Sequence, residues 1–107
     1  MNKVCYIAAP YTSNPEANVR KVMDVADELV KAGFVPYLPH LSHFWNLVSP
    51  KPYEFWLEYD LAILAKCDCV LRIPGESKGA DGEVEFALRN WIPVYYSVEE
   101  LVRSWSG

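Results

Sequence analysis

The chain has 107 residues, of which 51% are apolar and 14% aromatic, and this length suffices for a single domain with one core. The composition excludes a disordered segment, and a net charge of −4 without a cluster of Lys or Arg argues against binding of a nucleic-acid polymer. No apolar run approaches the ~20 residues of a membrane span and the N-terminus lacks a signal-peptide pattern, so we expect no membrane contact.

The first predicted elements are a strand and a helix. Residues 4–9 (VCYIAA) form a continuous apolar run, as expected for a strand that is covered on both faces. Ser13 and Glu16 have the spacing of a capping box, with Pro15 in the first turn of the helix. A stripe of apolar residues at helical spacing follows and ends at Gly33. The stripe consists of Val19, Val22, Met23, Ala26, Leu29 and Val30.

The middle of the chain contains two strands and one helix. Residues 34–38 (FVPYL) predict a short strand, and Pro36 within it indicates an edge position or early termination. Residues 39–52 are rich in His, Trp and Pro and are predicted to form a loop. A helix over residues 53–66 and a strand over residues 69–73 follow.

The last third of the chain continues the alternation. Residues 74–79 (PGESKG) predict a loop that opens a helix ending near Asn90, and residues 92–96 predict a fourth strand. Ser97 and Glu100 then repeat the capping-box pattern at the start of a terminal helix. We therefore expect a three-layer α/β fold of the flavodoxin or Rossmann type, with a small parallel sheet of four to five strands and helices on both faces. Ligands bind such sheets beyond the carboxyl ends of the strands.

The three cysteines do not have the spacing of a disulfide framework. Cys67 and Cys69 lie two residues apart at the start of a predicted buried strand. We expect them to pack as small apolar side chains rather than to bind a metal. Free thiols are typical of a reducing compartment, which predicts a cytoplasmic protein.

Asp60 is predicted to lie on the apolar face of the helix over residues 53–66. At ~100° per residue its neighbours on the helix surface are apolar or aromatic, whereas the charged side chains lie on the far side. Burying an unpaired carboxylate costs several kcal/mol. Asp60 therefore either caps the amides of a neighbouring loop or belongs to a functional site. The neighbours are Tyr53, Trp56, Leu57, Ile63, Leu64 and Cys67.

Four carboxylates lie where the third long helix begins, and they differ in how well each is placed to act on a ligand. They are Glu76, Asp81, Glu83 and Glu85. Glu83 borders the apolar stripe of this helix, one turn in and close to the strand ends, whereas Glu85 lies outside the stripe and is predicted to meet solvent. Glu83 is therefore the carboxylate best placed to reach a ligand. The stripe is predicted from Ala80, Val84, Ala87, Leu88 and Trp91.

Residues 77–94 resemble the signature of the nucleoside 2-deoxyribosyltransferase superfamily, which includes the 2′-deoxynucleoside 5′-monophosphate N-glycosidases. That signature runs Ser-x-Gly, a Glu four residues after the Gly, an Ala four residues further on, and a Pro-aliphatic pair that opens the next strand. It is matched without gaps by Ser77, Gly79, Glu83, Ala87, Pro93 and Val94. The similarity extends to residues 59–71 (YDLAILAKCDCVL) and to Tyr6 on the first strand. The chain is short for the superfamily and looks most like its uncharacterised branches.

The resemblance implies an enzyme that cleaves or transfers the N-glycosidic bond of a nucleoside or nucleotide. Glu83 matches the nucleophile that attacks C1′ of the sugar and forms a glycosyl-enzyme. Asp60 matches the acid beside the departing base, and Tyr6 the tyrosine that positions the nucleophile. Ser77 and Gly79 match the loop that meets the 5′ end of the sugar or its phosphate. The alternative is a non-catalytic nucleotide-binding or sensing module on the same fold.

Three further substrate contacts are expected from their positions. Ala9 and Pro10 lie at the carboxyl end of the first predicted strand. Asn18 borders the apolar stripe of the first helix, and it either contacts a ligand or bonds to the adjacent loop. No Arg occurs at this strand end to hold a phosphate, and Lys78 is the nearest substitute, which leaves nucleoside and nucleotide substrates open.

His40 and His43 are spaced as His-x-x-His in the predicted loop. Because only two ligands are evident and Pro39 argues against a helix, we expect loop packing or a substrate contact, and no metal or cofactor. Trp56 and the other aromatic residues over 44–56 either stack on a nucleobase or form core or a subunit interface. Four Trp and seven Tyr exceed what a small core hides, so a homodimer or higher homo-oligomer is expected.

Overall fold

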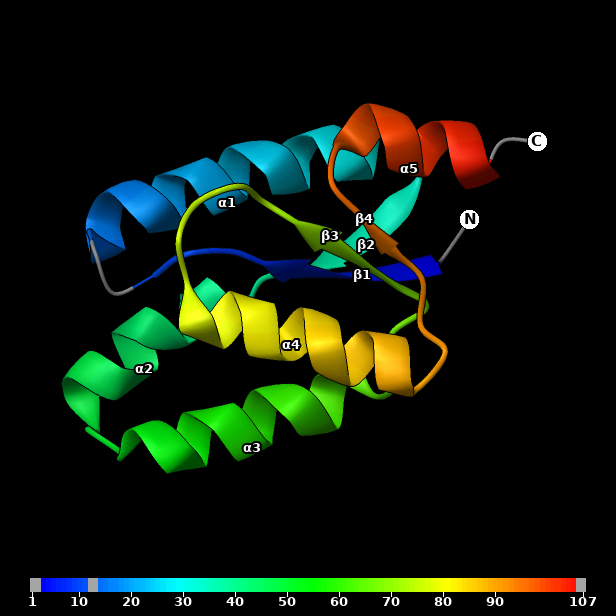
Figure 1. Cartoon of the computed structure of the whole chain (residues 1–107). Coiled ribbons are helices and arrows are strands. Elements are labelled where there is room, and N and C mark those ends of the chain that lie inside the picture. Colours follow the sequence, from blue (N-terminus) through cyan, green and yellow to red (C-terminus); the bar gives the residue numbers. More distant parts are fainter. Residues whose placement is uncertain (1–2, 12–13, 106–107) are drawn as a thin grey trace.

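The computed structural model describes residues 3–11 and 14–105, and within them four strands form one parallel sheet in the order β2-β1-β3-β4. The strands are β1 (Lys3–Ala8), β2 (Phe34–Tyr37), β3 (Cys69–Arg72) and β4 (Val94–Tyr95). The helices are α1 (Pro15–Lys31), the 3₁₀ turn η1 (Pro39–Leu41), α2 (Ser42–Val48), α3 (Tyr53–Leu64), α4 (Lys78–Arg89) and α5 (Val98–Trp105). Figure 1 shows α1 and α5 on one face of the sheet and α3 and α4 on the other, which confirms the three-layer α/β prediction.

The central strand β1 is buried on both faces, as its continuous apolar sequence predicted. Cys5 and Ile7 pack with the helices on the α1–α5 face, whereas Tyr6 and Ala8 pack on the α3–α4 face. Strand β2 lies at the edge of the sheet, which confirms the interpretation of Pro36.

Helix α1 begins one residue later than the capping-box pattern suggested. Its N-cap is Asn14, whose side-chain oxygen accepts a hydrogen bond from the Ala17 amide at 3.5 Å, and Pro15 is the first helical residue. Ser13, the predicted cap, lies outside the described residues. The helix ends as predicted just before Gly33, which has a φ of 94°.

The prediction of a loop over residues 39–52 is wrong for its first part, which forms η1 and α2. Pro39 was interpreted as a helix breaker, but its fixed φ suits the first position of a helical turn, and it opens η1 there. Asn46 then holds the connection to α3, because its Oδ1 accepts a hydrogen bond from the Lys51 amide at 2.9 Å.

Some predicted members of the apolar stripes are exposed. Met23 and Val30 of α1 and Leu88 of α4 face solvent, because a four-stranded sheet covers less of each helix than the stripes span. Trp91 is 93% exposed, since α4 ends at Arg89 and a φ of 61° turns the chain away from the helical direction. These four members of the predicted stripes therefore do not contribute to the core.

The three cysteines are buried free thiols, as expected. Cys5 and Cys69 are register partners on β1 and β3, and Cys67 lies just before β3. Among residues 3–11 and 14–105, no cluster of three or more His, Cys, Asp and Glu side chains could hold a metal ion. None of the helices in this part of the chain combines the length and the apolarity that crossing a membrane requires.

Candidate active site

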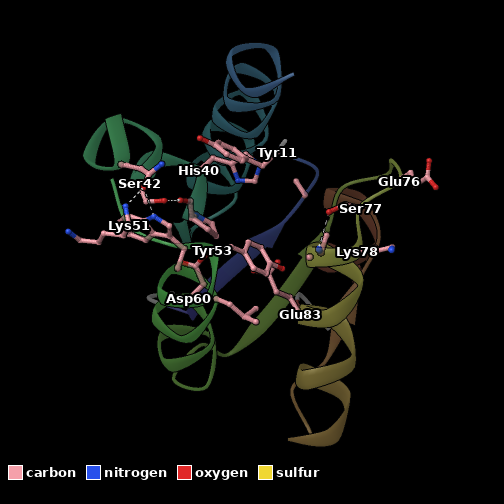
Figure 2. A pocket seen from close by; sticks show the side chains of 17 residues that line it. Tyr11, His40, Ser42, Lys51, Tyr53, Asp60, Glu76, Ser77, Lys78 and Glu83 are labelled. Atoms are coloured by element: carbon pink, nitrogen blue, oxygen red, sulfur yellow. Dashed lines mark hydrogen bonds between the residues drawn. The ribbon is translucent and has the colours of Figure 1, made fainter. Parts of the chain in front are cut away.

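A cavity of about 860 Å³ opens at the carboxyl end of β1. One wall comes from η1, α2 and α3, and the other from the loop before α4 and the first turns of α4 (Figure 2). This is the edge of the sheet at which the parallel topology predicts a ligand. The cavity is lined by Ala9, Tyr11, Pro39, His40, Ser42, Asn46, Lys51, Tyr53, Trp56, Leu57, Asp60, Glu76, Ser77, Lys78, Gly79, Ala80 and Glu83.

A hydrogen bond between Tyr6 and Glu83 joins the sheet to the α4 wall. The Tyr6 hydroxyl donates to Oε2 of Glu83 at 2.5 Å. Burial, together with the nearby Glu83 charge, raises the pKa of Tyr6, so its phenol remains a donor. Burial also raises the pKa of Glu83 to about 7, and Asp60 adds to the rise, while the Tyr6 hydrogen bond and the Arg72 charge oppose it. Glu83 can therefore change its ionisation near neutral pH.

Asp60 lies on the opposite wall, on α3. Figure 2 shows Asp60 and Glu83 approaching the cavity from different helices. Oδ1 of Asp60 is buried and has no hydrogen-bond partner among the described residues, so it does not cap a loop amide. Burial raises the pKa of Asp60 to about 7. A buried carboxyl oxygen without a protein partner is rare in folded proteins and is more typical of a functional site than of a structural carboxylate.

The other three acids of the 76–85 region have different surroundings. Asp81 pairs with Arg72 at 2.8 Å, and Glu85 pairs with Arg89 at 3.5 Å on the exposed side of α4, as predicted for Glu85. Glu76 lies at the rim of the cavity, and Figure 2 shows its side chain directed away from the centre. Of these four carboxylates, Glu83 is the one that contacts Tyr6.

Ser77 and Gly79 form the lip of the α4 wall. Ser77 is the N-cap of α4, and its Oγ accepts a hydrogen bond from the Ala80 amide at 3.1 Å. A Cβ atom at Gly79 would lie 3.7 Å from the Tyr53 hydroxyl, so the two walls approach each other here. The N-terminus of α4, with its partial positive charge, therefore lies at the edge of the cavity.

The chain matches, over residues 3–97, the family described as a domain of unknown function (DUF7768). The chain belongs to this family. A search of curated proteins found no match.

Two solved structures share the fold. A 2-deoxyribosyltransferase from the psychrotolerant bacterium Bacillus psychrosaccharolyticus superposes with a TM-score of 0.66 at 18% identity, covering 85% of this chain and 69% of that one. A 2-desoxiribosyltransferase from Leishmania mexicana gives 0.65 at 18% identity, covering 86% of this chain and 61% of that one. The chain thus spans less than two thirds of the Leishmania protein. At this identity, the likeness establishes the fold.

The structure brings six of the predicted site residues of this DUF7768 domain to the cavity, and a seventh, Tyr6, reaches it through Glu83. The six are Ala9, Trp56, Asp60, Ser77, Gly79 and Glu83. Three other predicted contacts, all within the described part of the chain, are not among the residues that line the cavity. They are Pro10, Asn18 and His43.

Those three residues support the connection between β1 and α1 instead. Asn18 donates from Nδ2 to the Tyr11 carbonyl at 3.1 Å, which is the loop contact considered from the sequence. His43 is buried, with Nδ1 2.5 Å from the Tyr11 hydroxyl and Nε2 3.3 Å from the Glu16 carboxylate. Nε2 of His40 lies 2.6 Å from the Pro10 carbonyl. The two histidines thus pack a loop, as expected, and His40 also lines the cavity.

Sequence reasoning missed most of the α2 side of the cavity. Asn46 accepts hydrogen bonds through Oδ1 from the Trp56 indole at 2.8 Å and from the Lys51 amide, which leaves its NH₂ group as a donor. Tyr11 and Ser42 also line this side. The available signal was Asn46 in the segment SHFWNLV. The prediction of a loop over residues 39–52 concealed that this residue lies on a helix beside the cavity.

Proposed function

We propose that the protein cleaves or transfers the N-glycosidic bond of a nucleoside or nucleoside 5′-monophosphate through a glycosyl-enzyme on Glu83. The observation that carries this proposal is the pair of carboxyl groups across one cavity, Asp60 on α3 and Glu83 on α4, with Glu83 bonded to Tyr6. Two carboxyl groups flanking a glycosidic bond suit the chemistry of retaining glycoside cleavage. The shared fold of the two deoxyribosyltransferases is consistent with this assignment.

In the first step Glu83 acts as a carboxylate. Its free oxygen attacks C1′ of the sugar while the electron pair of the N-glycosidic bond leaves with the base nitrogen. Tyr6 holds the other oxygen, Oε2, so that the carboxylate keeps one orientation. Asp60, as a carboxylic acid, gives its proton to the departing base. The products are an ester between Glu83 and C1′ and a neutral base.

In the second step Asp60 acts as a base and Glu83 is the leaving group. Asp60, now a carboxylate, takes a proton from water or from the N–H of a second base, and that nucleophile attacks C1′. The ester bond breaks and Glu83 leaves as a carboxylate. The raised pKa of Asp60, about 7, suits a group that must give a proton and take one back near neutral pH.

The two walls suggest how the substrate lies. The amide groups and Oγ at the Ser77–Gly79 lip face the 5′ end of the sugar, where Lys78 also lines the cavity. The base lies toward Asp60, where Trp56 provides an aromatic surface and Asn46 a fixed amide donor. This orientation places the bond to be broken between Glu83 and Asp60.

A substrate panel tests the proposal. The protein is incubated with nucleosides and with their 5′-monophosphates, in ribose and deoxyribose forms, with and without a second base, and free base is measured by chromatography. We expect base release from at least one substrate, lost in Glu83→Gln. Ligands that bind but are recovered unchanged would contradict the proposal and identify a binding or sensing module.

We also propose that the protein assembles as a homodimer or higher homo-oligomer through an α2–α3 aromatic surface, which consists of Phe44, Trp45, Leu47, Val48, Tyr53 and Phe55. All six side chains are exposed, and exposed apolar patches of this kind mark interaction sites. Val48 is 87% exposed, so Val48→Glu should leave the fold intact and give a monomer by light scattering. Val30→Glu, on exposed α1, is the matched control. A wild-type monomer at micromolar concentration would contradict this proposal.

A further inference from the structure

Arg72 is a buried cation that the sequence analysis did not single out. It is the last residue of β3, two residues after Val70, so it lies on the same face of the sheet as Val70, Tyr6 and Ala8. Its register partner on β1 is Ala8, whose small side chain leaves room beside it. Arg72 is 7% exposed, which is unusual for arginine unless its guanidinium is fully paired.

The guanidinium joins the end of β3 to the start of α4. Nη1 donates to the carbonyl of Ile73. Nη2 donates to the Gly75 carbonyl and to Oδ1 of Asp81, each at 2.8 Å. These three acceptors offset the cost of removing the charge from water. The acceptors belong to the loop at the cavity rim and to the first turn of α4. Arg72 therefore fixes the positions of this loop and of the helix start relative to the sheet.

The same loop is constrained from its other side by Pro10. Gly75 has a φ of 131°, and a Cβ atom there would lie 2.6 Å from Cγ of Pro10, so the position requires glycine. The loop is therefore held between Pro10 and the guanidinium of Arg72. Two residues later Ser77 caps α4, so the position of the helix N-terminus follows from this packing.

The placement of α4 determines where Glu83 lies. Asp81, which Arg72 holds, is two residues before Glu83 on the same helix. The groups that act on the Glu83 carboxyl come from three elements: Tyr6 on β1, Asp60 on α3 and Arg72 on β3. Arg72 is the cation among them and lowers the pKa of Glu83, whereas burial and Asp60 raise it. It therefore favours the ionised form that a nucleophile needs.

We propose that Arg72 is a positioning residue for Glu83: its guanidinium holds the first turn of α4 on the sheet, so that Glu83 faces Tyr6. The inference rests on the proposed function, in which Glu83 is the nucleophile. Asp81 is the exposed partner of this arrangement, 72% accessible at its side chain, and acts through Arg72 rather than on the substrate.

The test follows the titration of the Glu83 carboxyl by carbon-13 NMR, assigned with Glu83→Gln, in the wild type, Arg72→Met, Arg72→Lys and Asp81→Asn. Arg72→Met should raise the midpoint by about one pH unit, because it removes the cation. Arg72→Lys keeps the charge but loses the guanidinium group that donates to several acceptors at once. The Glu83 midpoint should therefore stay within ~0.3 pH unit of the wild-type value, while kcat falls several-fold. Asp81→Asn removes a negative charge, so the midpoint should not rise.

A purely structural role predicts a different pattern, in which Arg72→Met and Asp81→Asn behave alike. The proposal is wrong if folded Arg72→Met titrates as the wild type does, or if Asp81→Asn raises the midpoint. Should Arg72→Met fail to fold, an unchanged kcat in Arg72→Lys would overturn it. If the wild type releases no base, the proposed function fails, and the NMR midpoints in Arg72→Met and Asp81→Asn still decide whether Arg72 controls Glu83.

Discussion

The two faces of the sheet differ in chemistry although alternate residues of the same strands build them. On the α1–α5 face, Ile7 and Leu71 pack against Leu29 and Leu101 in an apolar core. On the α3–α4 face, the neighbouring positions are occupied by Tyr6 and Arg72, which form hydrogen bonds with Glu83 and Asp81 of α4. Because successive residues of a strand point to opposite faces, one strand can contribute to stability and to a site at once.

The polar face is costly to build. Asp60 and Glu83 are both partly buried, and one oxygen of Asp60 has no protein partner among the described residues. Such an arrangement persists when the rest of the fold is stable enough to hold it. We therefore expect substitutions on the two faces to separate activity from stability.

The largest effect is expected at Glu83. Glu83→Gln should abolish base release, because the amide cannot form the glycosyl ester, while the protein stays folded by circular dichroism. The matched control is Glu85→Gln, two residues further along α4, where the side chain pairs with Arg89 on the exposed side. It should change the rate only a few-fold. Equal losses in both variants would show that the site has been assigned to the wrong acid.

Asp60→Asn should have the next largest effect on activity. The amide cannot donate the proton, so base release should fall by about 10²- to 10⁴-fold. Bases that leave without a proton should be affected least, which kinetics with a series of leaving groups can measure. Because an amide is cheaper to bury than a carboxylate, the variant should unfold at an equal or higher urea concentration. A loss of stability with an equal loss for every leaving group would indicate a structural Asp60.

On the opposite face, Leu29→Ala should act on stability alone. Leu29 is fully buried among apolar side chains of α1, β1 and α5, so its truncation should cost about 2–5 kcal/mol of unfolding free energy. Urea unfolding measures the loss. Base release per folded molecule should stay close to the wild-type rate. A folded Leu29→Ala with strongly reduced activity would show that the two faces are coupled.

The last expected effect is a dependence of stability on pH. The folded-state pKa of Asp60 and of Glu83 is about 7, above ordinary values of 3.8 and 4.5, so the folded state holds more protons than the unfolded state between them. The contribution of both groups is therefore fully present below about pH 4 and is lost as the pH rises to about 7. Urea midpoints across this range should show a smaller decline in Asp60→Asn. An identical decline in the variant would show that Asp60 does not contribute to the pH dependence of stability.

Much of the fold and part of the site followed from local patterns. The apolar run of β1, the cap of α5 and the position of Asp60 on α3 depend on neighbours in the sequence, and the structure agrees with them. Helix α2 was missed because its seven residues have weak signals of their own, and packing decides their conformation. Arg72 was missed because its burial depends on Ala8 in register and on loop carbonyls, which no local pattern displays.

The covalent bond that we propose between Glu83 and the sugar can be detected by trapping the glycosyl-enzyme. The protein is incubated with a 2-fluoro analogue of whichever nucleoside or nucleotide releases base. The fluorine slows breakdown of the glycosyl-enzyme more than it slows its formation, so the adduct accumulates. Intact-mass and peptide mass spectrometry then locate the adduct. We expect one fluorinated sugar per chain, bound to Glu83 and absent in Glu83→Gln. Base release without any adduct, or an adduct on Asp60, would contradict it.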